Sequence, residues 1–135
     1  MIHYLLGTVT LSALVRDPAG AVARRIAMLG EETVATAPIV AGELRFGALR
    51  SGSAPLVERV EGLLARLQVL PLDDQVARSY ADVCRALERV GTAIGPNDLW
   101  VAAHALMAER VVVTGNGRVF RRVFGLCVED WRDGR

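Results

Sequence analysis

Short apolar runs alternate with longer segments in which apolar residues recur every three or four positions. The short runs are apolar or β-branched at successive positions, which is typical of buried strands. They predict strands at residues 2–6, 33–37, 68–72, 111–113 and 126–128. Within the longer segments, apolar residues are spaced by three or four positions, which is typical of helices that bury one face. This spacing predicts helices at residues 10–15, 18–29, 38–51, 55–67, 74–90, 95–110 and 118–123.

Prolines, glycines and short polar residues mark where these helices begin and end. Asp17 is expected to cap a helix whose first position is Pro18, and Asn97 to cap the helix that follows Gly95-Pro96. Asp73 and Asp74 are expected to cap the longest helix. Glycines stand where three helices should stop, at Gly30, Gly52 and Gly91.

Strands that alternate with helices along the whole chain predict an α/β fold with a mainly parallel sheet covered on both faces. We expect residues 1–135 to form a single domain. In such sheets the functional crevice lies beyond the carboxyl ends of the strands. The residues to inspect are therefore the segments 7–9 and 114–116, together with Glu43 and Asp98.

Composition narrows the functional classes. The 135 residues are 52% hydrophobic, which excludes a disordered chain. The formal net charge is +1 and all sixteen basic residues are arginine, so any contact with nucleic acid requires local patches. Cys84 and Cys127 lack metal-ligand spacing, which favours a reducing compartment. Without an export signal or an apolar run long enough to cross a membrane, the chain is expected to be soluble and cytoplasmic.

Two carboxylates stand in otherwise apolar helical segments. Asp98 falls in the first turn of its helix, where the helix dipole stabilises an anion, so it is either a simple helix-start residue or a cation ligand. Glu43 either faces solvent, pairs with a residue such as Arg45, or binds a metal. Together they suggest oxygen ligands for Mg²⁺ or Mn²⁺. A zinc site is disfavoured because neither histidine is spaced with a cysteine.

The sequence resembles PIN-domain ribonucleases of the VapC toxin type. The resemblance covers nearly the whole chain, and its strongest pieces are residues 40–48, 95–99, 113–116, 120–123 and 128–131. It implies an α/β/α sandwich and a Mg²⁺-dependent endoribonuclease, in which metal-activated water attacks an RNA phosphodiester. It also implies a homodimer that a VapB-type antitoxin neutralises in a heterotetramer or a larger complex. The residues that match the family's site are Asp98 and Glu43 as metal ligands, Asn116, and the supporting Thr8 and Thr114.

The chain departs from the family pattern at the end of its first strand and near Phe120. Gly7 stands where the family has a metal-binding aspartate, and Val9 replaces an asparagine. Val119 replaces a second acidic residue. The alternative explanation for Gly7 is a tight turn, and a phosphate cradle at residues 7–8 or 115–117 lacks a full fingerprint. Two functions remain: a ribonuclease whose metal is completed by water, or a catalytically silent domain that binds antitoxin or dimerises.

Several other residues have two readings. Arg118, Arg121 and Arg122 could contact RNA phosphates or form a solvated helix face, and the same holds for Arg45 and Arg50. For Trp100, Trp131 and His104, packing is favoured over base stacking or catalysis. Leu11, Leu14 and Val15 could line an apolar groove for an antitoxin helix or belong to the core.

Overall fold

A five-stranded parallel sheet forms the centre of the protein, in a computed structural model that describes residues 1–132. The strands are β1 (Tyr4–Leu6), β2 (Val34–Thr36), β3 (Gln68–Val69), β4 (Val111–Val113) and β5 (Val128–Glu129). Their order across the sheet is β3-β2-β1-β4-β5, and every neighbouring pair is parallel. The expected α/β fold with a parallel sheet is therefore confirmed. All five strands are shorter than the sequence pattern predicted or equal to it in length.

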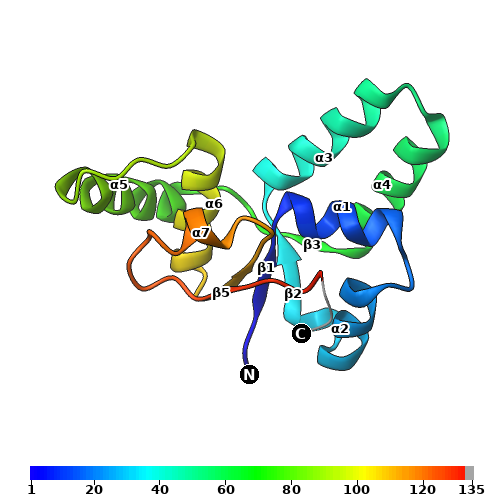
Figure 1. The fold of residues 1–135 in the computed structure, drawn as a ribbon, viewed down its shortest axis with the longest axis horizontal. Coiled ribbons are helices and arrows are strands. Elements are labelled where there is room, and N and C mark those ends of the chain that lie inside the picture. Colours follow the sequence, from blue (N-terminus) through cyan, green and yellow to red (C-terminus); the bar gives the residue numbers. More distant parts are fainter. Residues whose placement is uncertain (133–135) are drawn as a thin grey trace.

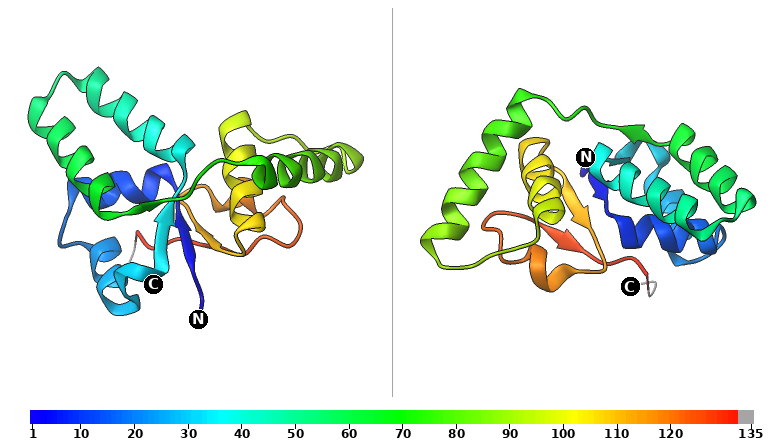
Figure 2. Two further views of the ribbon diagram at one scale, coloured as in Figure 1. Left: turned by 180° about the vertical axis from the view of Figure 1, so that it is seen from behind. Right: turned by 90° about the horizontal axis from the view of Figure 1, so that it is seen from above.

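Helices cover both sides of this sheet. They are α1 (Thr8–Arg16), α2 (Ala21–Leu29), α3 (Pro38–Ser51), α4 (Ala54–Arg66), α5 (Asp74–Arg89), α6 (Pro96–Met107) and α7 (Gly117–Phe120), with a short 3-10 turn η1 at Glu31–Thr33. Figure 2 shows α1 to α4 gathered on one side and α5 to α7 on the other, with the strands between the two groups. In Figure 1 the paired helices α3–α4 and α5–α6 extend outward from the region where β1 ends.

Two of the predicted helix caps are wrong. The second helix begins at Ala21 behind Gly20, because Asp17 still closes α1 through its own N–H bond to Ala13 O. Asn97 is not a cap: Pro96 takes the first helical position, which leaves Gly95 as the N-cap. The predicted stops are correct, since Gly52 and Gly91 have φ of 71° and 68° just after α3 and α5.

The C-terminal tail is fastened to the core by a tryptophan. The Trp131 side chain is only 1% exposed and meets the Tyr4 ring edge-on, with ring centroids 5.0 Å apart. Its indole N–H donates to Glu129 Oε1 at 2.9 Å, and the Arg25 guanidinium lies 5.5 Å from its ring. Trp131 thus serves packing. Trp100 likewise stacks on Tyr80, with ring centroids 3.9 Å apart.

His104 is a histidine buried in α6. Its imidazole is 1% exposed, and neither ring nitrogen has a hydrogen-bond partner among the described residues. Burial lowers the pKa of His104, which a nearby Asp73 partly counters and Arg110 reinforces. The expectation that His104 serves packing is consistent with this environment.

The free energy of unfolding is therefore expected to fall as the pH drops below the ordinary histidine value of about 6.5. In this pH range the unfolded chain binds a proton at His104 that the folded chain does not bind. The slope of the free energy of unfolding against pH therefore approaches about 1.4 kcal/mol per pH unit. Urea unfolding between neutral pH and pH 5 measures this slope. His104→Leu should flatten it, whereas His3→Gln should leave it unchanged. The same slope in the His104→Leu protein would contradict this origin.

Candidate active site

The carboxyl ends of β1 and β4 bring the candidate segment 7–9 together with the candidate segment 114–116. The N–H of Gly7 donates to Val113 O at 2.8 Å, so the loop after β1 lies against the end of β4. Helix α1 starts at once with Thr8, and the segment 114–116 follows β4 directly. This is the crevice that the strand order predicts.

Glu43 joins three helices at this crevice. It lies in the second turn of α3, where Thr8 Oγ1 donates to its Oε1 at 2.7 Å. Asn97 Nδ2, in the first turn of α6, donates to its Oε2 at 3.3 Å. Sequence reasoning assigned Asn97 to capping and missed this contact. An amide directly before Asp98, in a helix turn expected at the crevice, was the signal that could have revealed it.

Asp98 lies half-buried in the first turn of α6 and close enough to Glu43 for the two charges to interact. Burial is the main cause that raises the pKa of Asp98, the Glu43 charge adds to it, and a hydrogen bond from Asn116 opposes it. Asn116 Nδ2 donates to Asp98 Oδ2 at 3.4 Å. Within residues 1–132, neither Glu43 nor Asp98 forms an ion pair. The candidate Arg45 pairs with Glu61 instead, at 2.8 Å.

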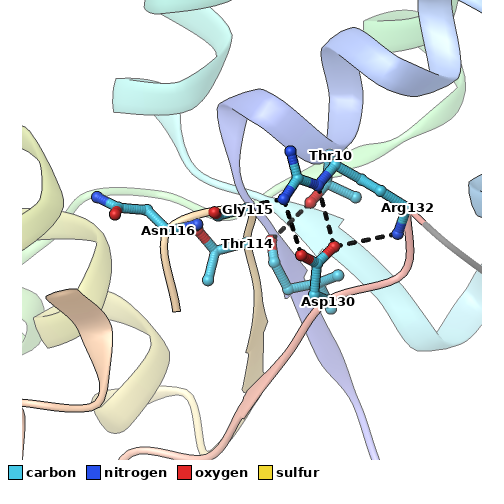
Figure 3. A network of polar contacts seen from close by, with 7 residues as sticks. Thr10, Thr114, Gly115, Asn116, Asp130 and Arg132 are labelled. Carbon is cyan, nitrogen blue, oxygen red and sulfur yellow. Dashed lines mark hydrogen bonds and ion pairs between the residues drawn. The ribbon is translucent and has the colours of Figure 1, made fainter. Parts of the chain in front are cut away.

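The loop that carries Asn116 is held from both sides (Figure 3). Thr114 is 5% exposed, and its Oγ1 accepts the N–H of Asn116 at 2.9 Å, so its hydroxyl shapes the loop. Arg132 Nη2 lies 3.5 Å from the carbonyl oxygen of Gly115 and 2.9 Å from Asp130 Oδ2. The Asn116 side chain points away from this Asp130–Arg132 pair.

The geometry at Gly7 does not require a glycine turn. Its φ of −84° and ψ of 176° are extended backbone that any residue adopts. An added Cβ would lie 3.1 Å from Val113 O, which calls for a shift of a few tenths of an ångström. Val119 is partly exposed in α7, one residue before the buried Phe120. In the part of the chain that the structure describes, no three His, Cys, Asp or Glu side chains gather as a metal-binding group.

The three candidate arginines after Asn116 are all exposed, but they have different surroundings. Arg122 Nη1 donates to the carbonyl oxygen of Ala93 at 3.1 Å. Arg121 lies close enough to Asp130 to help lower the pKa of that carboxyl, which depends mainly on Arg132. Arg118, two residues after Asn116, is the member of this group nearest in sequence to the crevice.

An apolar groove of about 570 Å³ lies on a different face, between α1, α2 and α4. Leu14, Val15 and Ile26 line it, with Arg59 and Arg66 among its polar members. Two of the three groove residues suggested by the sequence therefore do line a groove. Leu11 does not, because it is fully buried in the core.

Residues 4–125 match the family model of the PIN domain. The chain belongs to the PIN-domain family. Among its relatives is the tRNA(fMet)-specific endonuclease VapC of Salmonella typhimurium, 36% identical over 135 residues that cover 97% of this chain and 99% of that protein. Ribonuclease VapC1 of Haemophilus influenzae is 31% identical over 130 residues, covering 95% and 97%. The resemblance to VapC ribonucleases is thereby confirmed.

The structure of this PIN domain is similar to chains of solved toxin–antitoxin complexes. The DNA-bound VapBC of Salmonella typhimurium has a TM-score of 0.86 at 33% identity and covers 97% of this chain and 99% of that chain. VapBC2 of Rickettsia felis, bound to a DNA fragment from its promoter, has a TM-score of 0.85 at 28% identity with the same coverage. The α/β/α architecture of the PIN domain is therefore that of VapC proteins.

PIN-domain nucleases generally use a divalent metal, and the donor atoms of this site fit one. Glu43 and Asp98 are two carboxylates without a cationic partner within residues 1–132. The pKa of Asp98 is raised mainly by burial and further by the charge of Glu43. Their hydrogen bonds come from neutral groups of Thr8, Asn97 and Asn116. Carboxylate, amide and hydroxyl oxygens suit a hard divalent cation. Two carboxylates leave several positions of such an ion to water.

Proposed function

We propose that this PIN domain is the toxin of a VapBC-type pair and a Mg²⁺-dependent endoribonuclease of reduced activity. The observation that supports this most directly is the pair Glu43 and Asp98, which lie close enough at the strand ends for their charges to interact and have no cationic partner among the described residues. A cation bound to both groups would relieve the repulsion between the exposed Glu43 and the half-buried Asp98. Mn²⁺ is an alternative to Mg²⁺, since both are hard cations that prefer oxygen ligands.

Each residue then has a definite task. Glu43 and Asp98 hold the cation, while Thr8 and Asn97 orient Glu43 and Asn116 orients Asp98. Thr114 keeps the Asn116 loop in shape. When bound, the metal supplies an activated water and neutralises charge on the phosphodiester. Arg118 contacts RNA phosphates, and Arg121 and Arg122 do so after leaving their present partners.

Asp98→Asn is expected to lower RNA cleavage by about tenfold or more, because it removes a metal-binding charge while keeping the side-chain shape. Cleavage of a mixed transfer RNA sample, followed with Mg²⁺, with Mn²⁺ and with EDTA, measures this. EDTA should abolish cleavage by the unaltered chain. Asp82→Asn, on α5, is a matched control that should retain cleavage. Metal-independent cleavage, or full activity of Asp98→Asn, would refute the proposed chemistry.

A second candidate function is a catalytically silent PIN domain that binds an antitoxin or dimerises. Gly7 and Val119 favour it, because each stands where the family pattern has an acidic residue. Purified protein that cleaves no RNA with either metal, yet forms a stable complex with a VapB-type antitoxin, would establish this second function. Metal-dependent cleavage at ordinary enzyme rates would exclude it.

The remaining expectations belong to the same proposal. An amphipathic helix of the antitoxin is proposed to occupy the groove between α1, α2 and α4, where apolar residues are flanked by Arg59 and Arg66. The chain is proposed to act as a single domain of residues 1–135, as a homodimer, and in the cytoplasm. Within residues 1–132 no helix is both long and apolar enough to cross a membrane.

A further inference from the structure

A second cleft, of about 460 Å³, opens directly beside Glu43 between α1, α3 and α4. It borders the groove between α1, α2 and α4, because Val15 lines both. Its floor is apolar and is made by Leu44, Ala48, Leu56 and Val60. Thr8 and Glu43, which are joined by a hydrogen bond of 2.7 Å, form the end of the cleft nearest the carboxylate pair. The cleft is therefore continuous with the candidate active site.

One wall of the cleft carries a line of polar side chains. Thr8, Ser12 and Arg16 follow one another at intervals of four residues along α1, so they lie on the same helix face. From Thr8 to Arg16 the helix rises by about 12 Å. Arg16 is the last residue of α1, and its Nε donates to Ser12 O at 3.4 Å, which leaves other guanidinium N–H groups for an anion. The cleft thus has the carboxylate of Glu43 at one end and the guanidinium of Arg16 at the other.

We propose that this α1–α3–α4 cleft binds the nucleotide next to the scissile phosphate of an RNA substrate. The base and ribose lie on the apolar floor, and Arg16 binds the following phosphate. Its volume is in the range of pockets that hold small ligands. A nucleotide strand fits this order because the aromatic faces of its bases can lie on an apolar floor, and the anionic phosphates between them can pair with Arg16. The inference rests on the ribonuclease function proposed above.

Gly47 provides a way to close the cleft without harming the fold. It lines the cleft from α3, and an added Cβ would meet no atom within 4 Å. Replacing a glycine inside a helix also favours helix formation. Gly47→Leu should therefore fill the cleft and fold normally. Gly42→Leu is the matched control, because Gly42 has equally open space in the same helix and lies about 140° around its axis.

The experiment measures fluorescence anisotropy of short, labelled, single-stranded oligoribonucleotides of the four homopolymer sequences, and maps cleavage sites in transfer RNA. Gly47→Leu is expected to bind about tenfold more weakly, equivalent to about 1.4 kcal/mol, and to change nucleotide preference at one position beside the cut. Gly42→Leu should match the unaltered chain. Arg16→Gln should lower the slope of log affinity against log salt by about 0.7, the value for one single-strand phosphate contact. Arg24→Gln, on α2, should not.

The outcomes separate this inference from the ribonuclease proposal. Weaker binding by Gly47→Leu alone, in a chain that cuts no RNA, would support the cleft and refute catalysis. If Gly47→Leu keeps its RNA affinity, its cleavage preference and its metal-dependent cleavage, the proposal that the cleft binds a nucleotide is refuted. The ribonuclease proposal then still holds, and a protein segment becomes the occupant to test for the cleft. Failure of the unaltered chain to bind any of the oligoribonucleotides would also refute nucleotide binding by the cleft. Thermal unfolding of each variant checks that the fold is kept.

Discussion

Gly7→Asp combined with Val119→Glu is expected to raise Mg²⁺-dependent RNA cleavage by at least about tenfold. Gly7 is the N-cap of α1, directly before Thr8, which already holds Glu43. A carboxylate there adds a third negative charge at the strand ends. The backbone conformation at Gly7 is one that aspartate adopts, and its Cβ requires Val113 O to move by a few tenths of an ångström. The helix N-terminus also stabilises that charge. Initial cleavage rates at several Mg²⁺ concentrations measure the gain.

The matched control is Gly7→Asn combined with Val119→Gln. Asparagine caps a helix about as well as aspartate, so both double variants should gain the same small stability from α1. Only the acidic pair should gain cleavage, and Mg²⁺ should raise its melting temperature more, because an ion that binds the folded state alone stabilises it. Equal cleavage by the acidic and amide pairs would show that charge at these two positions does not limit the site.

The parallel sheet could be predicted from the sequence because its signal is local. Each buried strand is a short apolar run, and each intervening helix has its own apolar stripe. Helix starts were less certain where two signals competed. Asp17-Pro18 resembles a cap and a first-turn proline, yet the backbone of Asp17 completes α1 and Gly20 becomes the cap.

The candidate site was only partly predictable, because side-chain contacts between distant segments have no local signal. The alternation of strands and helices implied that Glu43, Asp98 and Asn116 lie near one crevice. In the structure, Glu43 accepts hydrogen bonds from Thr8 and Asn97, and Asp98 accepts one from Asn116. The partner of Arg45 could not be deduced, since Glu61 comes from the neighbouring helix α4. The cleft beside Glu43 depends on how α1, α3 and α4 pack, which residue spacing alone does not determine.

The C-terminal tail illustrates the same limit. Asp130 and Arg132 stand in a polar stretch with no local signal for a contact, yet Arg132, paired with Asp130, reaches the carbonyl oxygen of Gly115. Residues 133–135 lie outside the described part of the chain. Trp131, between the two polar residues, is the apolar anchor that keeps them against the loop.

Trp131→Ala is expected to lower the free energy of unfolding by about 3–5 kcal/mol. The change empties a site that is 1% exposed, removes the edge contact with Tyr4 and leaves Glu129 without its indole donor. Urea denaturation at neutral pH measures the loss. Trp100→Ala is the matched control, since Trp100 is only half-buried and should cost less.

Trp131→Phe then separates packing from the hydrogen bond, because it keeps an aromatic ring but has no N–H for Glu129. We expect it to retain most of the stability lost in Trp131→Ala, since burial of the ring contributes more than one hydrogen bond to a partly exposed carboxylate. If Trp131 also holds the Asp130–Arg132 pair against Gly115, folded Trp131→Ala protein should bind Mg²⁺ more weakly, because Asn116 loses its support near Asp98. Unchanged stability in Trp131→Ala would show that the tail is not part of the core, and unchanged Mg²⁺ affinity would show that the Asn116 loop does not depend on it.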